Sequence, residues 1–379
     1  MILEAIIEWF IYSNLAFVNM MGQYFEHEGF NPVQLGALMA VVPSLALVAN
    51  PFWFWVKKKF GEKKTVGIIT FIPAVTCWGI FLLPGFIPKL IGLVGYGFFA
   101  TSVVPLTEAG VMNSLMNKGI HLDRSRMLGT VGFSSTALLL GFVIGFGYHM
   151  MFVVVTVALL AAFFFSRRLK LPDKMSEKKY RSDENGSIKV FVIMLITAML
   201  GIMNASFCGA FLPVLVSDRG YPENVVGISF AVLSISEVPF LFFAKSIINK
   251  MGNIFLLTTG IFAVALRVLL TPLTVSPLTL VLVHILHGWN YIVIYYSIFN
   301  YIHFKLKEKH LNKAQATFWM VIQGGGFLSG YLGGGFLVDA LGLYNAYYTF
   351  GTISLLYSIP LFVWSFFDIR KRKLRAGGH

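Results

Sequence analysis

The feature that most constrains this chain is a series of long apolar segments separated by short polar connections. A helix of about twenty apolar residues crosses the hydrocarbon core of a bilayer. The chain is 57% hydrophobic and 12% charged, with a mean hydropathy of +0.75, which is not the balance of a soluble domain. The sequence therefore predicts an all-α integral membrane protein surrounded by a lipid bilayer.

Twelve segments have the length of a membrane span, and they divide into two sets of six. The predicted spans are 2–24, 33–56, 65–83, one span before and one span after the turn at Asn117-Lys118-Gly119, 148–165, 188–216, 225–247, 254–273, 278–304, 314–341 and 344–367. The expected domains are an N-terminal six-helix bundle at 1–166, a cytoplasmic linker at 167–187, a C-terminal six-helix bundle at 188–367 and a basic cytoplasmic tail at 368–379.

The basic residues show which side of the membrane each connection occupies. The net charge is +13, and most Lys and Arg lie in alternate short connections, such as 57–64 and 305–313, and in the tail. Cytoplasmic loops carry such an excess, so we expect both termini in the cytoplasm of a bacterium, with the chain in its inner membrane, and no nucleic-acid partner. The first segment lacks a basic start and a cleavage site, and we interpret it as a membrane helix.

The two sets of six spans are an internal repeat. Gly29 corresponds to Gly220, Gly36 to Gly227 and Gly61 to Gly252, with a separation of 191 residues in each case. Six spans repeated in the same orientation give two bundles related by an axis along the membrane normal. In transporters built this way the binding site lies near the midplane between the bundles.

A carboxylate and a guanidinium face each other across the fourth and fifth spans. Glu108 and Arg126 are equally far from Asn117 in the sequence, so an antiparallel hairpin brings both to the same depth, roughly 13 Å from the turn. Charges inside a membrane are costly unless they pair or meet a polar ligand. The pair is therefore either a structural link between two helices or a ligand-binding pair.

A second polar group is expected in spans nine and ten. Arg267 and His287 are each ten residues from Pro277 and should lie at equal depth. His284 and His287 are three residues apart and share a helix face with Tyr291. They are either packing residues or part of a proton-coupled site, since histidine changes protonation near neutral pH. Two histidines are too few ligands for a metal site, and we expect no metal or other cofactor.

The sequence shows no sign of an enzyme. We find no nucleophile with its base, no set of metal ligands and no phosphate-binding loop. Cys77 and Cys208 both lie in apolar segments, so no disulfide framework is implied.

With these residues placed, nearly the whole chain resembles the major facilitator superfamily. It is most similar to the branch that contains lactose permease and the phenylpropionate and nucleoside proton symporters. The resemblance is carried by Glu108, then Arg126-Met127-Leu128-Gly129 and Gly132-Phe133, at the spacing of that branch. It implies that Glu108 and Arg126 bind substrate hydroxyls and that Phe133 stacks on a sugar ring.

The second half resembles the branch through Arg267 and Leu286-His287. This implies roles in proton coupling for Arg267 and His287, with His287 also binding substrate. Glu237 resembles the carboxylate of span eight, displaced by about one helical turn, and is expected to form the coupling cluster with Arg267 and His287. Asn290 stands where the branch has a titrating glutamate, and His284 stands where lactose permease has a lysine.

The connection after span two resembles the gating loop of the superfamily. Gly61 matches the pattern, whereas Lys58 stands where an acidic residue is usual.

Together these features predict a secondary active transporter that works by alternating access. The expected substrate is a small polar organic solute of sugar or nucleoside type, moved by proton symport through a monomer. Two alternatives remain: an aromatic-acid carrier in which Arg126 takes the carboxylate, and a solute receptor or lipid-interacting protein that transports nothing.

Overall fold

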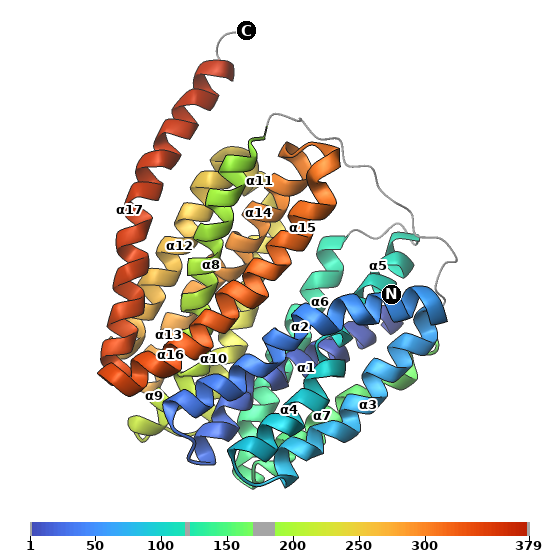
Figure 1. Ribbon diagram of the computed structural model, residues 1–379. Coiled ribbons are helices and arrows are strands. Elements are labelled where there is room, and N and C mark those ends of the chain that lie inside the picture. The colour runs from blue at the N-terminus through green and yellow to red at the C-terminus, as the bar shows by residue number, and fades with distance from the viewer. Residues whose placement is uncertain (1, 118–121, 170–185, 377–379) are drawn as a thin grey trace.

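The computed structural model describes residues 2–117, 122–169 and 186–376, and within these ranges every regular element is a helix (Figure 1). The side chains of residues 112, 113, 116, 117, 122–126, 312 and 368–376 lie outside the described part. Eleven helices of the described part are long and apolar enough to cross a membrane. The predicted all-α membrane fold is therefore confirmed.

The first half of the chain runs to residue 169. Its elements are α1 (Ile2–His27), α2 (Pro32–Phe60), α3 (Glu62–Leu82), α4 (Phe86–Ala100), α5 (Val103–Asn117), α6 (Leu122–Val143), the short 3-10 helix η1 (Ile144–Phe146) and α7 (His149–Ser166). The fourth predicted span comprises α4 and α5, because the helix is interrupted at residues 101 and 102.

The second half begins at residue 186. Its first elements are α8 (Ile188–Ala210), α9 (Leu212–Asp218), α10 (Asn224–Ile235), α11 (Val238–Met251), α12 (Asn253–Leu270) and η2 (Thr271–Leu273). The chain continues with α13 (Pro277–Val283), η3 (His284–Trp289), α14 (Tyr291–Lys305), η4 (Glu308–His310), α15 (Leu311–Met320), η5 (Val321–Phe327), α16 (Leu328–Leu341) and α17 (Leu343–Ala376).

Four predicted spans of the second half are interrupted helices. Span seven is broken between α8 and α9. Span eight is broken between α10 and α11, and span ten contains the 3-10 helix η3. Span eleven, predicted as one helix over 314–341, contains a π-helical stretch at η5 and is not among the eleven candidate membrane helices. Irregular backbone at membrane depth is tolerated where it is buried in protein or lines a cavity.

Local sequence signals account for several helix starts. Asn31 caps α2 by accepting the Gln34 amide hydrogen at 2.8 Å, and the Gln34 side chain accepts the Asn31 amide at 3.2 Å. Ser276 caps α13 in the same way, with Pro277 at the first helical position. These reciprocal bonds satisfy amide groups that a helix start otherwise leaves without partners.

The predicted repeat is visible in the backbone. Gly29 and Gly220 have φ angles of 76° and 61°, and Gly61 and Gly252 have φ angles of 88° and 75°. Residues with a Cβ atom disfavour this left-handed backbone conformation, so glycine suits all four turns. The two halves therefore turn at corresponding places.

The two halves meet at one end of the molecule, which we call the glycine-turn end because Gly29 and Gly220 lie there. The opposite end, called the basic end, carries the lysine-rich connections 57–64 and 305–313. The helices of the two halves converge at the glycine-turn end, which is the lower end in Figure 1.

Two related helix pairs make this contact, α2 with α16 and α6 with α10. A Cβ atom on Gly335 would lie 2.6 Å from the carbonyl oxygen of Pro32, and one on Gly227 would lie 2.6 Å from the Cα atom of Gly141. The helices thus approach each other too closely for side chains at these positions.

Hydrogen bonds also join the two halves at the glycine-turn end. The amide nitrogen of the Gln23 side chain donates to the carbonyl oxygen of Glu223 at 2.8 Å. Tyr148, which lies between two spans, bonds to the Glu223 carboxylate. Burial, and next the negative charge of Glu223, raise the pKa of Tyr148 well above its ordinary value. The phenol therefore remains a hydrogen-bond donor to the other half.

The final helix is longer than its predicted span at 344–367. The basic stretch that was expected as a tail from residue 368 continues α17 to Ala376. Its arginines and lysines have high helix propensity, so the end of the apolar segment does not end the helix.

Candidate functional site

In the first half, Glu108 projects from α5 toward α1. The Tyr12 hydroxyl donates to Oε1 of Glu108 at 3.3 Å, and the carboxylate is only partly buried. A partly exposed carboxylate beside a phenol has room to accept hydrogen bonds from hydroxyl groups of a ligand. Glu108 was predicted to belong to either a structural pair or a ligand-binding pair with Arg126, and its partial exposure is compatible with the second alternative.

Two glycines bring α6 against this part of α1. A Cβ atom on Gly129 would lie 2.5 Å from the Tyr12 ring, and one on Gly132 would lie 2.6 Å from Trp9. The Trp9 indole nitrogen also donates to the Ser135 hydroxyl at 2.6 Å. The glycines of the predicted motif therefore set the distance between α6 and the two aromatic residues of α1.

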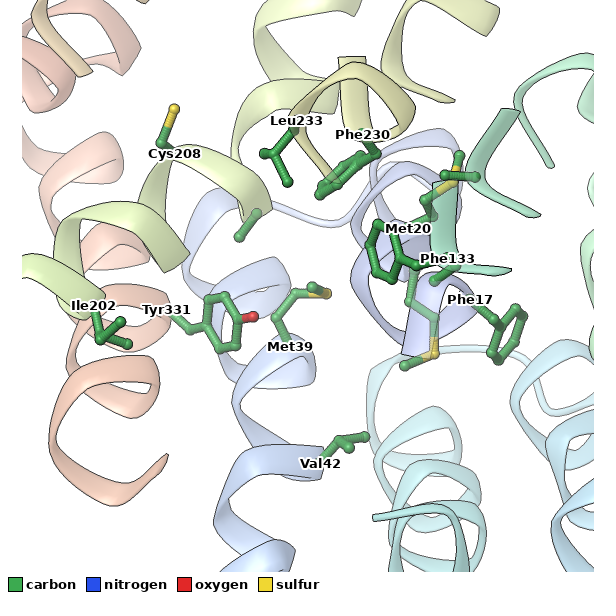
Figure 2. Close-up of a cluster of buried hydrophobic side chains, with 14 of the residues drawn as sticks. Phe17, Met20, Met39, Val42, Phe133, Ile202, Cys208, Phe230, Leu233 and Tyr331 are labelled. Atoms are coloured by element: carbon green, nitrogen blue, oxygen red, sulfur yellow. The ribbon is translucent and has the colours of Figure 1, made fainter. Parts of the chain in front are cut away.

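The other two predicted residues of this half are placed differently. The backbone of Arg126 lies in α6, and its side chain is outside the described part, so the pairing with Glu108 stays a prediction. Phe133 is 7% exposed and packs in an apolar cluster formed by both halves, together with Met20 and Phe230 (Figure 2). In this conformation the ring is part of the contact between the halves.

In the second half, the interruptions of spans eight and ten lie against each other. Glu237 stands at the start of α11, and His287 lies in η3. Nε2 of His287 is 3.3 Å from Oε1 of Glu237. A Cβ atom on Gly288 would collide with the carbonyl oxygen of Ser236, so only glycine lets the two breaks approach this closely.

Three buried polar residues near the middle of span ten recur at intervals of three. His284, His287 and Asn290 are all buried, and side chains three residues apart are eclipsed on a 3-10 helix. Nδ1 of His284 donates to the carbonyl oxygen of Leu280 at 2.8 Å. The His287 ring stacks with that of Tyr291 at 6.1 Å between centroids. The face predicted for His284, His287 and Tyr291 thus combines two residues of the 3-10 helix η3 with the first residue of α14.

Arg267 lies in α12 and faces the two histidines. It is fully buried, and it is close enough to both His284 and His287 to interact with them electrostatically. None of its guanidinium nitrogens has a hydrogen-bond partner among the described residues. The equal depth expected for Arg267 and His287 agrees with this arrangement.

The predicted gating loop lies apart from both polar groups. Lys58 is exposed in the last turn of α2, and Gly61 forms the turn to α3. Lys57 and Glu62 bridge the same turn with an ion pair of 3.0 Å. The structure therefore places this connection at the basic end, away from Glu108 and His287.

Sequence reasoning missed several polar positions. Tyr12 has no signal of its own, because an aromatic residue in an apolar segment is usually a packing residue. The interruption of span four was also missed: the Asn14 side chain donates to the carbonyl oxygen of Ala100 at 3.3 Å, and the Tyr96 hydroxyl donates to Asn14. An asparagine in span one is the only signal that could have indicated it.

Lys89 is a further buried charge that was missed. It is fully buried in α4, where its ammonium nitrogen is 3.1 Å from the Glu28 carboxylate and donates to the carbonyl oxygen of Ile80 at 3.1 Å. The Tyr24 hydroxyl is a third partner. Tertiary contacts with Glu28, Ile80 and Tyr24 therefore cover this charge.

Comparisons with known proteins agree with this architecture. A model of the MFS_1 like family matches residues 5–349. The chain is similar to the uncharacterized transporter YwbF of Bacillus subtilis (strain 168), with 23% identity over 337 residues that cover 85% of this chain and 82% of that protein. It is also similar to the maltose permease of Geobacillus stearothermophilus, with 22% identity over 246 residues, or 63% of this chain and 62% of that protein.

Solved structures show the same fold. The nucleoside transporter NupG superposes with a TM-score of 0.79 at 17% identity, covering 96% of this chain and 98% of that one. A POT family transporter, solved in complex with a thioalcohol conjugated peptide, superposes with a TM-score of 0.74 at 12% identity, covering 96% and 95%.

Proposed function

Because the chain belongs to the MFS_1 like family and is a transporter, not an enzyme, we propose that it moves a small polar organic solute of sugar or nucleoside type. The resemblance and the fold class predicted from the sequence are both confirmed by the family match and by the likeness to NupG. The names of two relatives, a maltose permease and a nucleoside transporter, support this solute class.

The environment of Glu108 is the main support for this proposal. Its carboxylate is partly exposed and already accepts one hydroxyl, that of Tyr12, at 3.3 Å. Sugars and nucleosides present several hydroxyl groups, and a carboxylate binds such donors through short charge-assisted hydrogen bonds. Arg126 completes the site from α6, and the aromatic rings of Trp9 and Tyr12 provide faces on which a sugar or base can stack.

Alternating access follows from the contacts between the halves, which act as the two moving bundles. The halves touch at the glycine-turn end through α2 with α16 and α6 with α10. We assign the basic end to the cytoplasm of a bacterium by the positive-inside rule, with both termini there. The structure then corresponds to a state of a monomer that is closed on the outside.

Proton coupling is assigned to the pair formed by Glu237 and His287. Their 3.3 Å contact lies where two interrupted helices meet, and both side chains retain some exposure. A proton that moves between solvent and this pair changes its charge, and with it the relative stability of the two access states. Asn290 cannot titrate, so it takes no part as a proton carrier.

The decisive experiment is solute uptake into proteoliposomes by wild type and Glu108→Gln. The panel contains mono- and disaccharides, nucleosides and arylpropionates. The substitution should reduce uptake of the active solute roughly 10- to 100-fold, because a hydrogen bond to a charged group contributes about 1.5–3 kcal/mol. Glu308→Gln, which alters an exposed acid at the basic end, should retain uptake.

Three results would contradict the proposal. The first is wild-type uptake of every active solute by Glu108→Gln. The second is uptake of arylpropionates alone, which would favour the aromatic-acid carrier. The third is binding without flux, which would favour the receptor.

A further inference from the structure

Arg267 of α12 and Arg219 are the arginines of this half whose side chains the structure describes, and their environments differ. Arg219 donates to the carbonyl oxygens of Thr274 and Pro272, to the Thr274 hydroxyl and to the Tyr344 hydroxyl. Arg267 is more deeply buried and has no acceptor at Nε, Nη1 or Nη2 among the described residues. A buried guanidinium without acceptors is strongly unfavourable, so its position requires an explanation.

A second donor without a partner among the described residues lies in the same span as the two histidines. Asn290 is fully buried, and its side-chain oxygen accepts the amide hydrogen of Tyr291. This bond fixes the orientation of the amide group, so Nδ2 is the atom that has no partner. The carbonyl oxygen of Asn290 lies near Gly260 of α12, which places the two elements in contact.

The histidines add groups that can serve either as acceptors or as donors. Nδ1 of His284 must be protonated because it donates to the Leu280 carbonyl, which leaves Nε2 as an acceptor in the neutral ring. His287 uses Nε2 toward Glu237, and its Nδ1 has no partner among the described residues. Both remaining nitrogens accept a hydrogen bond when neutral and donate one when protonated.

We propose that Arg267 and Asn290, with His284 and His287 beside them, bind a small oxyanion, that is, a carboxylate or phosphate group. The planar guanidinium matches two oxygens of such a group at once, which a spherical halide cannot offer. A hydroxyl on the same group, as in hydrogen phosphate, donates to a neutral histidine nitrogen. The negative charge of the oxyanion compensates the positive charge of the buried Arg267 guanidinium.

Among these polar residues, Glu237 and His287 retain some exposure. The side chains of these two residues are 15% and 10% exposed, whereas Arg267, His284 and Asn290 are fully covered. The oxyanion therefore enters when Glu237 and His287 separate. Both lie at helix breaks, where a change of backbone angles disrupts few helical hydrogen bonds.

The oxyanion is either a free ion or a group carried by the transported solute. In the second case the inference rests on the transport function proposed above and narrows its substrate to sugar or nucleoside acids or phosphates. The two sources are distinguished by comparing sodium phosphate and sodium acetate with glucose, glucuronate and glucose 6-phosphate.

The test is the thermal unfolding midpoint of the full chain in detergent, measured against ligand concentration at constant ionic strength in sodium chloride. Phosphate or acetate should raise the midpoint of wild type in a saturable way. Arg267→Gln should weaken the apparent affinity at least about tenfold, which corresponds to the loss of a charge-assisted hydrogen bond. Arg219→Gln, the matched control, should respond as wild type does.

If Arg267→Gln fails to fold, Arg267→Lys serves in its place, because it keeps the charge and loses the two-pronged geometry. Asn290→Ala should weaken binding by a smaller factor. A response confined to glucuronate and glucose 6-phosphate, and lost in the Arg267 variant, assigns the oxyanion to the solute. An equal response from free ions assigns it to a separate ion.

The inference is overturned if no oxyanion shifts the midpoint of wild type, if chloride shifts it equally, or if the Arg267 variants respond as wild type does. The variant Glu108→Gln distinguishes a failure of the oxyanion inference from a failure of the transport proposal. It should lose uptake of neutral solute and keep the response to phosphate or acetate.

Discussion

The two halves of the molecule hold their buried polar groups in different ways. In the first half, the polar residues of the site lie within helices α1 and α5, and hydroxyls donate to the carboxylates: Tyr12 donates to Glu108, and Ser114 donates to Glu4 at 2.7 Å. In the second half, the polar residues lie where helices are interrupted, and the Arg267 guanidinium has no acceptor among the described residues.

The difference indicates a division of roles. A site whose side chains are already bonded changes little when a ligand arrives, because its geometry exists beforehand. A site with buried donors that lack acceptors has more to gain from a ligand or from a change of state. We therefore expect the first half to select the solute and the second half to respond to it.

The largest effect should come from Gly288→Ala, which removes the close approach of the two helix breaks. Its Cβ atom would collide with the Ser236 carbonyl oxygen, and overpacking of this kind costs about 1–3 kcal/mol or more. The thermal unfolding midpoint should fall, and transport should fall with it. Gly95→Ala in α4 is the matched control, since nothing lies within 4 Å of its added Cβ. Equal unfolding midpoints for Gly288→Ala and Gly95→Ala would contradict the importance of the close contact between the helix breaks in the second half.

A smaller effect is expected from Glu237→Gln, which keeps an oxygen acceptor for His287 and removes the titrating charge. Accumulation of solute against its gradient, driven by an imposed proton gradient, should drop roughly tenfold if one charged hydrogen bond of about 1.4 kcal/mol is lost. Exchange of solute without a gradient should persist. Undiminished accumulation in this variant would show that protons couple elsewhere, and the first half would then need a proton site of its own.

The smallest effect should come from Tyr12→Phe. It removes the 3.3 Å hydrogen bond to Glu108 and leaves the ring in place against Gly129. A neutral donor contributes about 0.5–1.5 kcal/mol, so the KM for the solute should rise roughly 2- to 13-fold with little change in the unfolding midpoint. Ser114→Ala, which affects Glu4 at the same helix interface, is the comparison variant. A KM that moves only in Ser114→Ala would shift the solute site toward Glu4.

Much of the fold was predictable from local patterns. Apolar segments of sufficient length must form helices in a bilayer because each backbone amide needs an internal partner there. The repeat was also readable, since Gly29, Gly61, Gly220 and Gly252 mark turns with positive φ. The starts of α2 and α13 follow from their capping residues.

The helix interruptions were not predictable in the same way. Spans eight and ten read as uninterrupted apolar segments, and their breaks are stabilised by contacts between distant residues, such as Gly288 with Ser236. Lys89 was hidden for a related reason, because its partners Glu28 and Tyr24 come from another helix and its turn. A pattern along one segment carries no information about which distant group will satisfy a charge.

For the candidate site, the sequence determined which residue types stand at membrane depth: Glu108, Glu237, Arg267, His284 and His287 are exceptional there because charge and polarity are costly in a hydrocarbon medium. Only the tertiary structure decided their partners. It paired Glu237 with His287, Glu108 with Tyr12, and left Arg267 facing the histidines without an acceptor among the described residues. The cost of burying a charge depends on the residue itself, whereas its compensation depends on atoms that only folding brings within a few ångströms.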